Sequence, residues 1–156
     1  MIPKNITYPA DWITVREYRD GSRWCSVAGK NIPVQVFAGG ISRQEVEQAE
    51  QVSKDIFTGH AQDNPFFMIA DLRRLQGMTG YIRQSTKGLM ASLPRDRQHY
   101  FALVMVDNLP NRLLSVFVNG LARATGRHIH IYICYTPEAA MAWIEQKRAN
   151  AASQAS

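Results

Sequence analysis

The feature that most constrains the fold is a threefold alternation of strand-like and helix-like segments between residues 65 and 150. The strand-like segments are Pro65–Asp71, Tyr100–Val106 and His128–Tyr135. The first two are continuously apolar, which is typical of strands covered on both faces. Strands joined through helices pair in parallel by right-handed crossovers. The sequence therefore predicts an α/β fold with parallel β-α units in its C-terminal half.

The segments that follow these strands carry helix signals. Helices are predicted at Thr79–Leu93, at Pro110–Thr125 and from Pro137 to about Arg148. Thr136, Pro137 and Glu138 supply an N-cap, a proline at the first helical position and an acid in the first turn. Residues 151–156 are small and polar, and we expect them to form a disordered tail.

The first forty residues have the pattern of antiparallel strands. Strands are predicted at Trp12–Tyr18, Ser22–Ala28 and Pro33–Phe37, the first two joined by the turn signal Asp20–Gly21. They suit a hairpin plus an edge strand. A helix over Ser42–Thr58 follows, because Ser42 and Glu45 form a capping box. The central sheet should be mixed, with these antiparallel strands at one end and helices mainly on one face.

Length and composition favour a single domain over residues 1–150. The chain has 156 residues, and 46% of them are hydrophobic, which suits one substantial core. We expect no transmembrane segment, because no run reaches the roughly 18 consecutive apolar residues that cross a bilayer. The N-terminus lacks an apolar signal-peptide core, so a cytoplasmic location is expected. Cys25 and Cys134 form no CxxC pair and are expected to be free thiols.

Positive charge is concentrated in the second half. Nine Lys/Arg and two Asp/Glu lie between residues 73 and 135, within a net charge of +5. This excess favours an anionic partner, or else arginines that are simply spread over a solvated surface. Nucleic acid is not predicted, because the arginines lack the interleaved aromatics of a stacking platform.

No familiar catalytic or cofactor motif is present. The sequence has no GxGxxG, Walker loop, GxSxG or HExxH, so we predict no enzyme and no cofactor. His128, His130 and Cys134 would share one face of a strand, since side chains alternate. That arrangement is open to two interpretations, a metal or catalytic site and an edge strand with a half-polar face. His60 and His99 fall in connections.

Two surfaces are candidates for binding. Asp71, Arg73, Arg74 and Asp107 follow strand ends, and ligands bind there in open α/β sheets. This rim could hold a small anionic, nucleotide or lipid ligand, or its charges could pair locally.

The second candidate surface is the helix predicted over residues 110–125, which is apolar on more than one face. Its partner-facing residues would be Arg112, Leu113, Phe117 and Leu121. A helix that is apolar nearly all round is buried or contacts a partner, so core burial, a dimer interface, a partner groove and an acyl-chain site all remain open.

The segments PFFMIADLRRL, YFALVMV, HIHIYICY and TPEAAMAWIEQ together resemble a known family. Over residues 41–148 the chain is similar to the SpoIIAA-like branch of the STAS (anti-sigma factor antagonist) superfamily. The resemblance implies a four- or five-stranded mixed sheet with helices mainly on one side. It also implies a domain without enzyme activity that binds a partner protein and, in some branches, nucleotide or lipid.

The regulatory serine motif of that family would fall on Gly77, Met78, Thr79 and Gly80. Met78 stands at the phosphorylated position, so the resemblance implies that the usual phosphoserine switch is missing. Thr79 is either a substitute acceptor at a helix N-terminus or an ordinary N-cap.

The sequence thus predicts a non-enzymatic, STAS-like regulatory or protein-binding domain, acting with a protein partner or as a homodimer. Its binding regions would be residues 77–80 and the helix 112–125. The first alternative is a small-ligand protein that binds lipid or nucleotide. The second is a metal or enzyme site at His128, His130 and Cys134.

Overall fold

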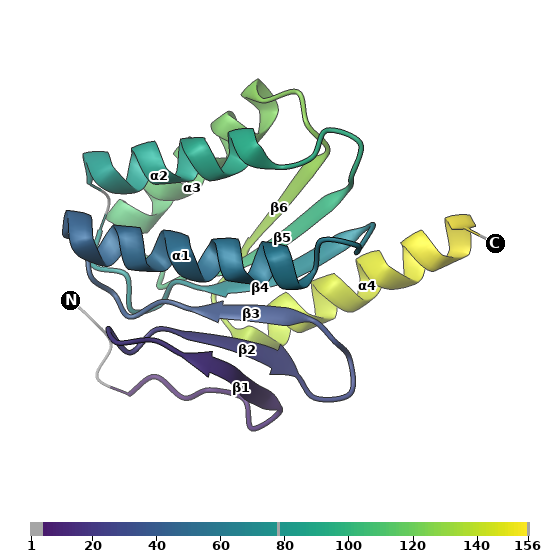
Figure 1. The fold of residues 1–156 in the computed structure, drawn as a ribbon, viewed down its shortest axis with the longest axis horizontal. Helices are drawn as coiled ribbons and strands as arrows, with labels where there is room; N and C mark the ends of the chain where they lie inside the picture. The colour runs from purple at the N-terminus through teal and green to yellow at the C-terminus, as the bar shows by residue number, and fades with distance from the viewer. Residues whose placement is uncertain (1–4, 78, 156) are drawn as a thin grey trace.

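The computed structural model describes residues 5–77 and 79–155, which form one α/β domain (Figure 1). The strands are β1 (Trp12–Glu17), β2 (Arg23–Val27), β3 (Pro33–Val36), β4 (Phe66–Asp71), β5 (His99–Val104) and β6 (Ile129–Cys134). The helices are α1 (Arg43–Gly59), α2 (Gly80–Ser92), α3 (Leu109–Ala124) and α4 (Pro137–Ala155). The predicted α/β fold class is confirmed. The sheet has six strands in the described part of the chain, against the four or five that the family resemblance implies.

The strands lie in the sheet in the order in which they occur along the chain, β1-β2-β3-β4-β5-β6. β1, β2 and β3 pair antiparallel, and β3, β4, β5 and β6 pair in parallel. The mixed sheet is therefore arranged as predicted. β3 is not the edge strand that the sequence suggested, because α1 carries the chain over to β4, which pairs with the free side of β3.

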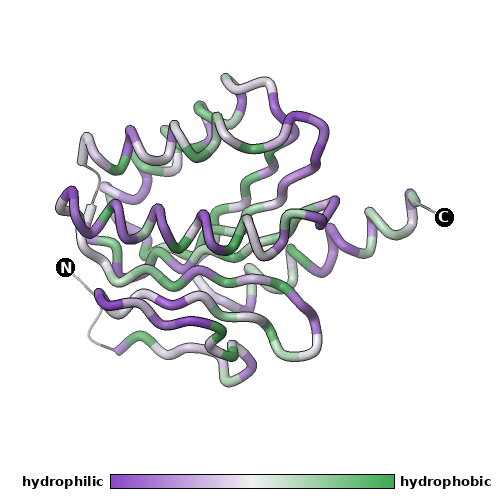
Figure 2. Tube along the Cα trace, in the orientation of Figure 1, coloured by the Kyte–Doolittle hydropathy of each residue, from purple (hydrophilic) through white to green (hydrophobic). Residues whose placement is uncertain are grey.

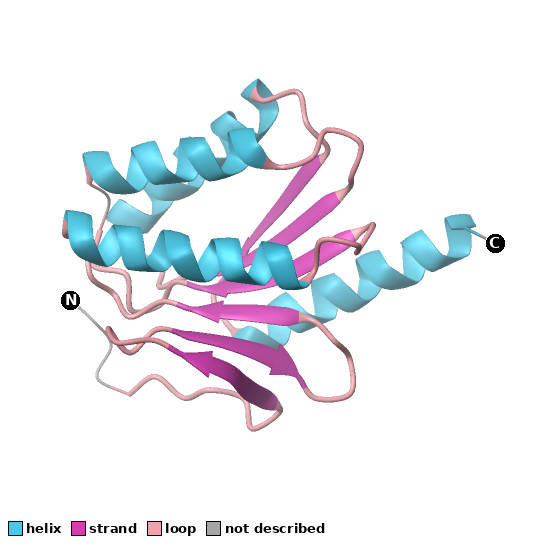
Figure 3. Cartoon of the chain, in the orientation of Figure 1, coloured by secondary structure: helices cyan, strands magenta, loops and turns pink. Residues whose placement is uncertain are grey.

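Three helices cover one face of the sheet, and α4 alone covers the other (Figures 1 and 3). The alternation of side chains along each strand separates the two cores. On β5, Phe101 and Leu103 point toward α1, α2 and α3, whereas Ala102 and Val104 belong to the core under α4. Both faces of β4 and β5 are thus buried, which explains why their sequences are continuously apolar.

The amphipathic pattern of α1 is visible along its length, where hydrophilic and apolar positions recur (Figure 2). Its buried positions include Val52 and Ile56. Ser42 is the N-cap, as predicted, and its hydroxyl accepts a hydrogen bond from the Glu45 amide at 3.3 Å. The capping signal therefore places the start of the helix correctly.

The final helix is longer than the sequence suggested. α4 continues to Ala155, through residues 151–155 that we expected to be a disordered tail. Alanine has the highest helix propensity, and residues 149, 151 and 152 are alanines. The buried residues of α4 are Pro137, Ala140 and Ile144, so its C-terminal half extends away from the sheet (Figure 1). No helix in residues 5–77 and 79–155 is long and apolar enough to cross a membrane.

Candidate functional site

Two of the predicted rim residues, Asp71 and Arg73, form an ion pair at the end of β4. Asp71 is 2% exposed, and its carboxylate accepts hydrogen bonds from Arg73 Nε at 2.9 Å and Arg73 Nη2 at 2.7 Å. The Arg73 backbone amide donates a third bond to Asp71 Oδ1 at 3.1 Å. Arg73 Nη2 also donates to the Thr7 carbonyl at 3.1 Å. The structure shows the local pairing that was one of the two interpretations of these residues.

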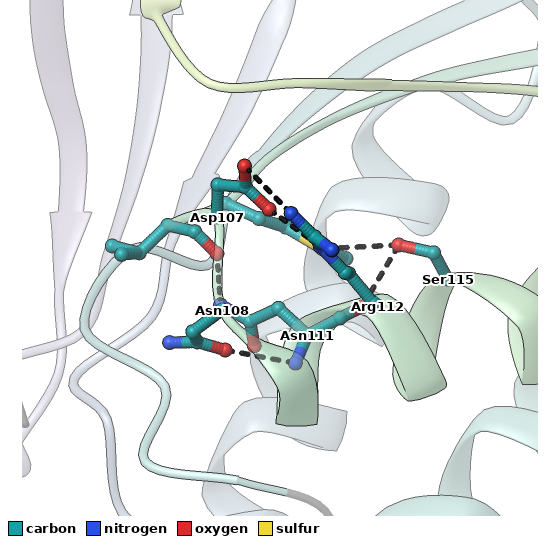
Figure 4. A network of polar contacts seen from close by, with 7 residues as sticks. Asp107, Asn108, Asn111, Arg112 and Ser115 are labelled. Atoms are coloured by element: carbon teal, nitrogen blue, oxygen red, sulfur yellow. Dashed lines mark hydrogen bonds and ion pairs between the residues drawn. The ribbon is translucent and has the colours of Figure 1, made fainter.

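The other two rim residues, Arg74 and Asp107, are exposed. Asp107 accepts hydrogen bonds from Arg112 Nε at 2.9 Å and Nη2 at 3.3 Å (Figure 4). These bonds from Arg112 lower the pKa of Asp107. Arg74 is exposed, and its backbone packs closely against Gly39. None of the four predicted rim residues lines the apolar cavity described below.

The start of α3 is fixed by a separate set of hydrogen bonds. Asn108 is the N-cap, and its Oδ1 accepts from the Asn111 amide at 2.9 Å (Figure 4). Asn111 Nδ2 donates to the Val106 carbonyl at 2.6 Å, and Ser115 Oγ donates to the Asn111 carbonyl at 2.9 Å. These bonds satisfy polar groups at the β5–α3 connection and hold the first turn of α3 in place.

The predicted regulatory loop leads into α2. Gly77 has φ +147°, Gly80 is the first helical residue, and Met78 lies outside the described residues. Thr79 is the N-cap of α2: its Oγ1 accepts from the Ile82 amide at 3.3 Å and donates to the Ile41 carbonyl at 3.4 Å. Thr79 therefore has the ordinary capping role that was one of its two interpretations. Its phosphorylation stays a prediction.

Removing this cap should weaken the domain measurably. We expect Thr79→Ala to lower the free energy of unfolding by about 1 kcal/mol, the usual contribution of an N-cap hydroxyl. Urea denaturation monitored by circular dichroism would measure the change. Thr79→Ser keeps the hydroxyl and should stay close to the unsubstituted chain. Equal stability of the alanine and serine variants would show that the cap contributes nothing.

The strand that carries the histidines is β6, at the edge of the sheet. The edge-strand interpretation is thus confirmed. His130 is exposed, stacks on Tyr100 with 4.6 Å between ring centroids, and its Nε2 contacts Gln98 Oε1 at 3.0 Å. Cys134 is buried, and burial raises the pKa of its thiol to about 11. His128 is exposed and precedes the strand.

The search for a metal-binding group around His128, His130 and Cys134 extends to all described residues. Within residues 5–77 and 79–155, no group of three or more His, Cys, Asp or Glu side chains is placed to hold a metal ion. The protonated, buried Cys134 thiol is also poorly suited to act as a nucleophile or ligand.

Part of the basic excess is used inside the fold. Arg97 is buried and its Nη1 donates to the carbonyls of His60 at 3.1 Å and Ala61 at 3.0 Å. Arg127 donates to the carbonyls of Leu93 at 2.9 Å and Ala91 at 2.7 Å, at the C-terminal end of α2. Arginine count alone therefore overestimates the positive charge that is free to meet an anionic partner.

The predicted partner surface of α3 is divided between the core and the solvent. Phe117 and Leu121 are half-buried against the core. Leu113 is exposed, and so are two residues that the sequence analysis did not single out, Leu109 and Val116. Their i, i+4 and i+7 spacing puts all three on one helix face. We call Leu109, Leu113 and Val116 the α3 row.

An apolar cavity, which no sequence pattern predicted, lies between the sheet and helices α1, α2 and α3. Its volume is about 170 Å³. We call this space the α2 cavity, because α2 contributes Ile82, Leu89 and Met90 to its wall.

Comparison with protein-family models, curated protein sequences and solved structures finds no match to this chain.

Proposed function

We propose that the chain is a non-enzymatic, STAS-like regulatory domain that binds a protein partner through the α3 row. The observation that carries this proposal is the exposure of Leu109 (69%), Leu113 (62%) and Val116 (73%) on one face of a helix. Clustered apolar side chains in water are typical of interaction sites. The STAS-like assignment rests on the family resemblance and is supported by a mixed sheet with three of its four helices on one face.

Neighbouring residues extend this surface and indicate the chemistry of the partner. Tyr135 is 53% exposed just after β6, and α3 follows β5, the strand that pairs with β6 in parallel, so both lie at the same edge of the sheet. Arg123 is exposed near the end of the same helix, and Arg112, near its start, is exposed and paired with Asp107. An amphipathic helix that carries acidic residues beside its apolar face would match both features. The partner we propose is therefore an acidic protein that presents such a helix.

Introducing a charge into the α3 row should abolish this interaction. We expect Val116→Glu to weaken partner binding at least about tenfold, because a central apolar contact in an interface contributes 1–2 kcal/mol or more. The partner would be captured with the purified chain, identified and purified. Its dissociation constant would then be measured by calorimetry at two salt concentrations.

Val15→Glu is the matched control. Val15 is 53% exposed on β1, at the opposite edge of the sheet, and this variant should bind like the unsubstituted chain. Equal affinity for the Val116→Glu variant would contradict the proposal. Self-association of the chain that Val116→Glu disrupts, with no other partner, would show that the α3 row binds a second copy instead.

A further inference from the structure

The α2 cavity has walls from every layer on its side of the sheet. Met68 and Ala70 of β4 form part of its floor, together with Phe101 and Leu103 of β5. Val46, Ala49 and Phe57 of α1 lie along one side, and Ile82, Leu89 and Met90 of α2 along another. Such walls suit a compact hydrocarbon group, since apolar pockets of about 150 Å³ in other proteins take up benzene.

The polar groups within the wall are already hydrogen-bonded to the protein. Ser53 Oγ donates to Gln35 Oε1 at 2.8 Å, and Gln35 Nε2 donates to the Ala49 carbonyl at 2.9 Å. Thr86 Oγ1 donates to the Ile82 carbonyl at 2.8 Å. The buried side-chain atoms without a partner in the described residues belong to Trp24 and His99, which do not line the cavity. The interior therefore favours an occupant without polar groups.

One charged group borders the cavity, where α1 meets α2. Glu50 is the one Asp, Glu, Lys, Arg or His among the described wall residues, and its side chain is 32% exposed. Its Oε2 accepts from Ser85 Oγ of α2 at 3.1 Å, and its Oε1 accepts from Lys54 Nζ at 3.0 Å. An ionised carboxylate can accept further hydrogen bonds but has no proton to donate. A ligand head group at this point should donate a hydrogen bond and carry no negative charge.

Hydrogen bonds fix both ends of the helix above the cavity. Met90 is the one buried residue of α2 among those described. Arg127 binds the carbonyls of Ala91 and Leu93 at the end of α2. At the start of the helix, Thr79 Oγ1 accepts from the Ile82 amide and donates to the Ile41 carbonyl. The Ser85–Glu50 hydrogen bond joins α2 to α1 at this border of the cavity.

We propose that the α2 cavity binds a small uncharged ligand, a hydrocarbon chain or ring of about six to nine carbons with a hydroxyl group that donates to Glu50. This site goes beyond the protein-binding function, because its wall includes none of the α3 row. Its failure would therefore leave the protein-binding proposal untouched.

Methionine methyl groups provide a direct test. Met68 and Met90 line the cavity, whereas Met105 and Met141 do not. With ¹³C-methyl methionine in the full chain, titration with 1-octanol should shift the Met68 and Met90 signals in a saturable manner. The Met105 and Met141 signals should stay nearly unchanged. Absence of saturation, or equal shifts at all four positions, would overturn the proposal.

Two cavity-filling variants test where the ligand binds. Ala70→Leu fills the cavity from the sheet and should weaken 1-octanol binding at least about tenfold. Ala49→Leu fills it from α1 and serves the same purpose if the first variant does not fold. Unchanged affinity in a folded cavity-filling variant would contradict the site.

The charge of the head group is tested with octanoate. Octanoate should bind at least about tenfold more weakly than 1-octanol, because its carboxylate would lie beside that of Glu50. Glu50→Gln should reduce this difference. Octanoate that binds as tightly as 1-octanol to the unsubstituted chain would overturn the assignment to an uncharged ligand.

Discussion

Arg73→Ala is expected to lower the free energy of unfolding by about 3–5 kcal/mol. The substitution leaves the Asp71 carboxylate, which is 2% exposed, without the two hydrogen bonds from the guanidinium. Removing one partner of a buried ion pair has this cost because the remaining charge stays in a medium that solvates it poorly. Urea denaturation at neutral pH would measure the loss.

The chain offers a matched control for this prediction. Arg112 and Asp107 form the same two-bonded pair, with bonds of 2.9 and 3.3 Å, but on the exposed surface. Exposed pairs contribute little, since water solvates either charge alone. Arg112→Ala should therefore leave stability almost unchanged. A similar small effect of Arg73→Ala would mean that the Asp71 carboxylate is solvated after all.

Acidification should destabilise the domain through His99. This side chain is fully buried, and burial, followed by the nearby charge of Arg97, lowers the pKa of His99 to about 4. In the unfolded chain its pKa is about 6.5. The contribution of neutral His99 to the free energy of unfolding is fully present above pH 6.5. It is lost as the pH falls from 6.5 toward 4, because only the unfolded state then binds the proton. The loss amounts to about 3 kcal/mol in total.

His99→Phe isolates this contribution. Arg97 Nε donates to His99 Nε2 at 3.3 Å, so His99 Nδ1 carries the proton, and that donor is buried without a partner. Phenylalanine keeps the ring between Phe66 and Phe101 and removes the titration. The decline in unfolding free energy between pH 7 and 4 should be about 3 kcal/mol smaller in this variant. Equal declines would show that other groups account for the pH dependence.

The sequence predicted the parts of the fold that depend on local periodicity. The apolar runs of β4 and β5 require two covered faces, and the structure confirms the helix start at Ser42. The N-cap of α3, Asn108, was not predicted from the sequence. His99 was placed in a connection, although it is the first residue of β5. A histidine gives no strand signal of its own, and its burial depends on Arg97 and Phe66, which pack around it.

The candidate sites were harder to predict because they depend on distances between elements. Periodicity indicates that Ile82 and Leu89 face inward, but not how far α2 lies from the sheet, and that separation creates the α2 cavity. Leu113 and Phe117 share a side of α3 by spacing, yet one is exposed and the other packs against the core. By contrast, Asp71 and Arg73 are two residues apart, so their local pairing could be anticipated.

The order of the strands has a consequence for synthesis of the chain. Each strand pairs with the one made just before it, so the sheet can grow at a single advancing edge as the ribosome releases successive segments. The sheet face under α4 is covered last, because Ala140 and Ile144 of α4 pack against Ile69, Ala102 and Val104. Until α4 has emerged from the ribosome, the nascent domain presents an apolar sheet face, the kind of surface that chaperones bind.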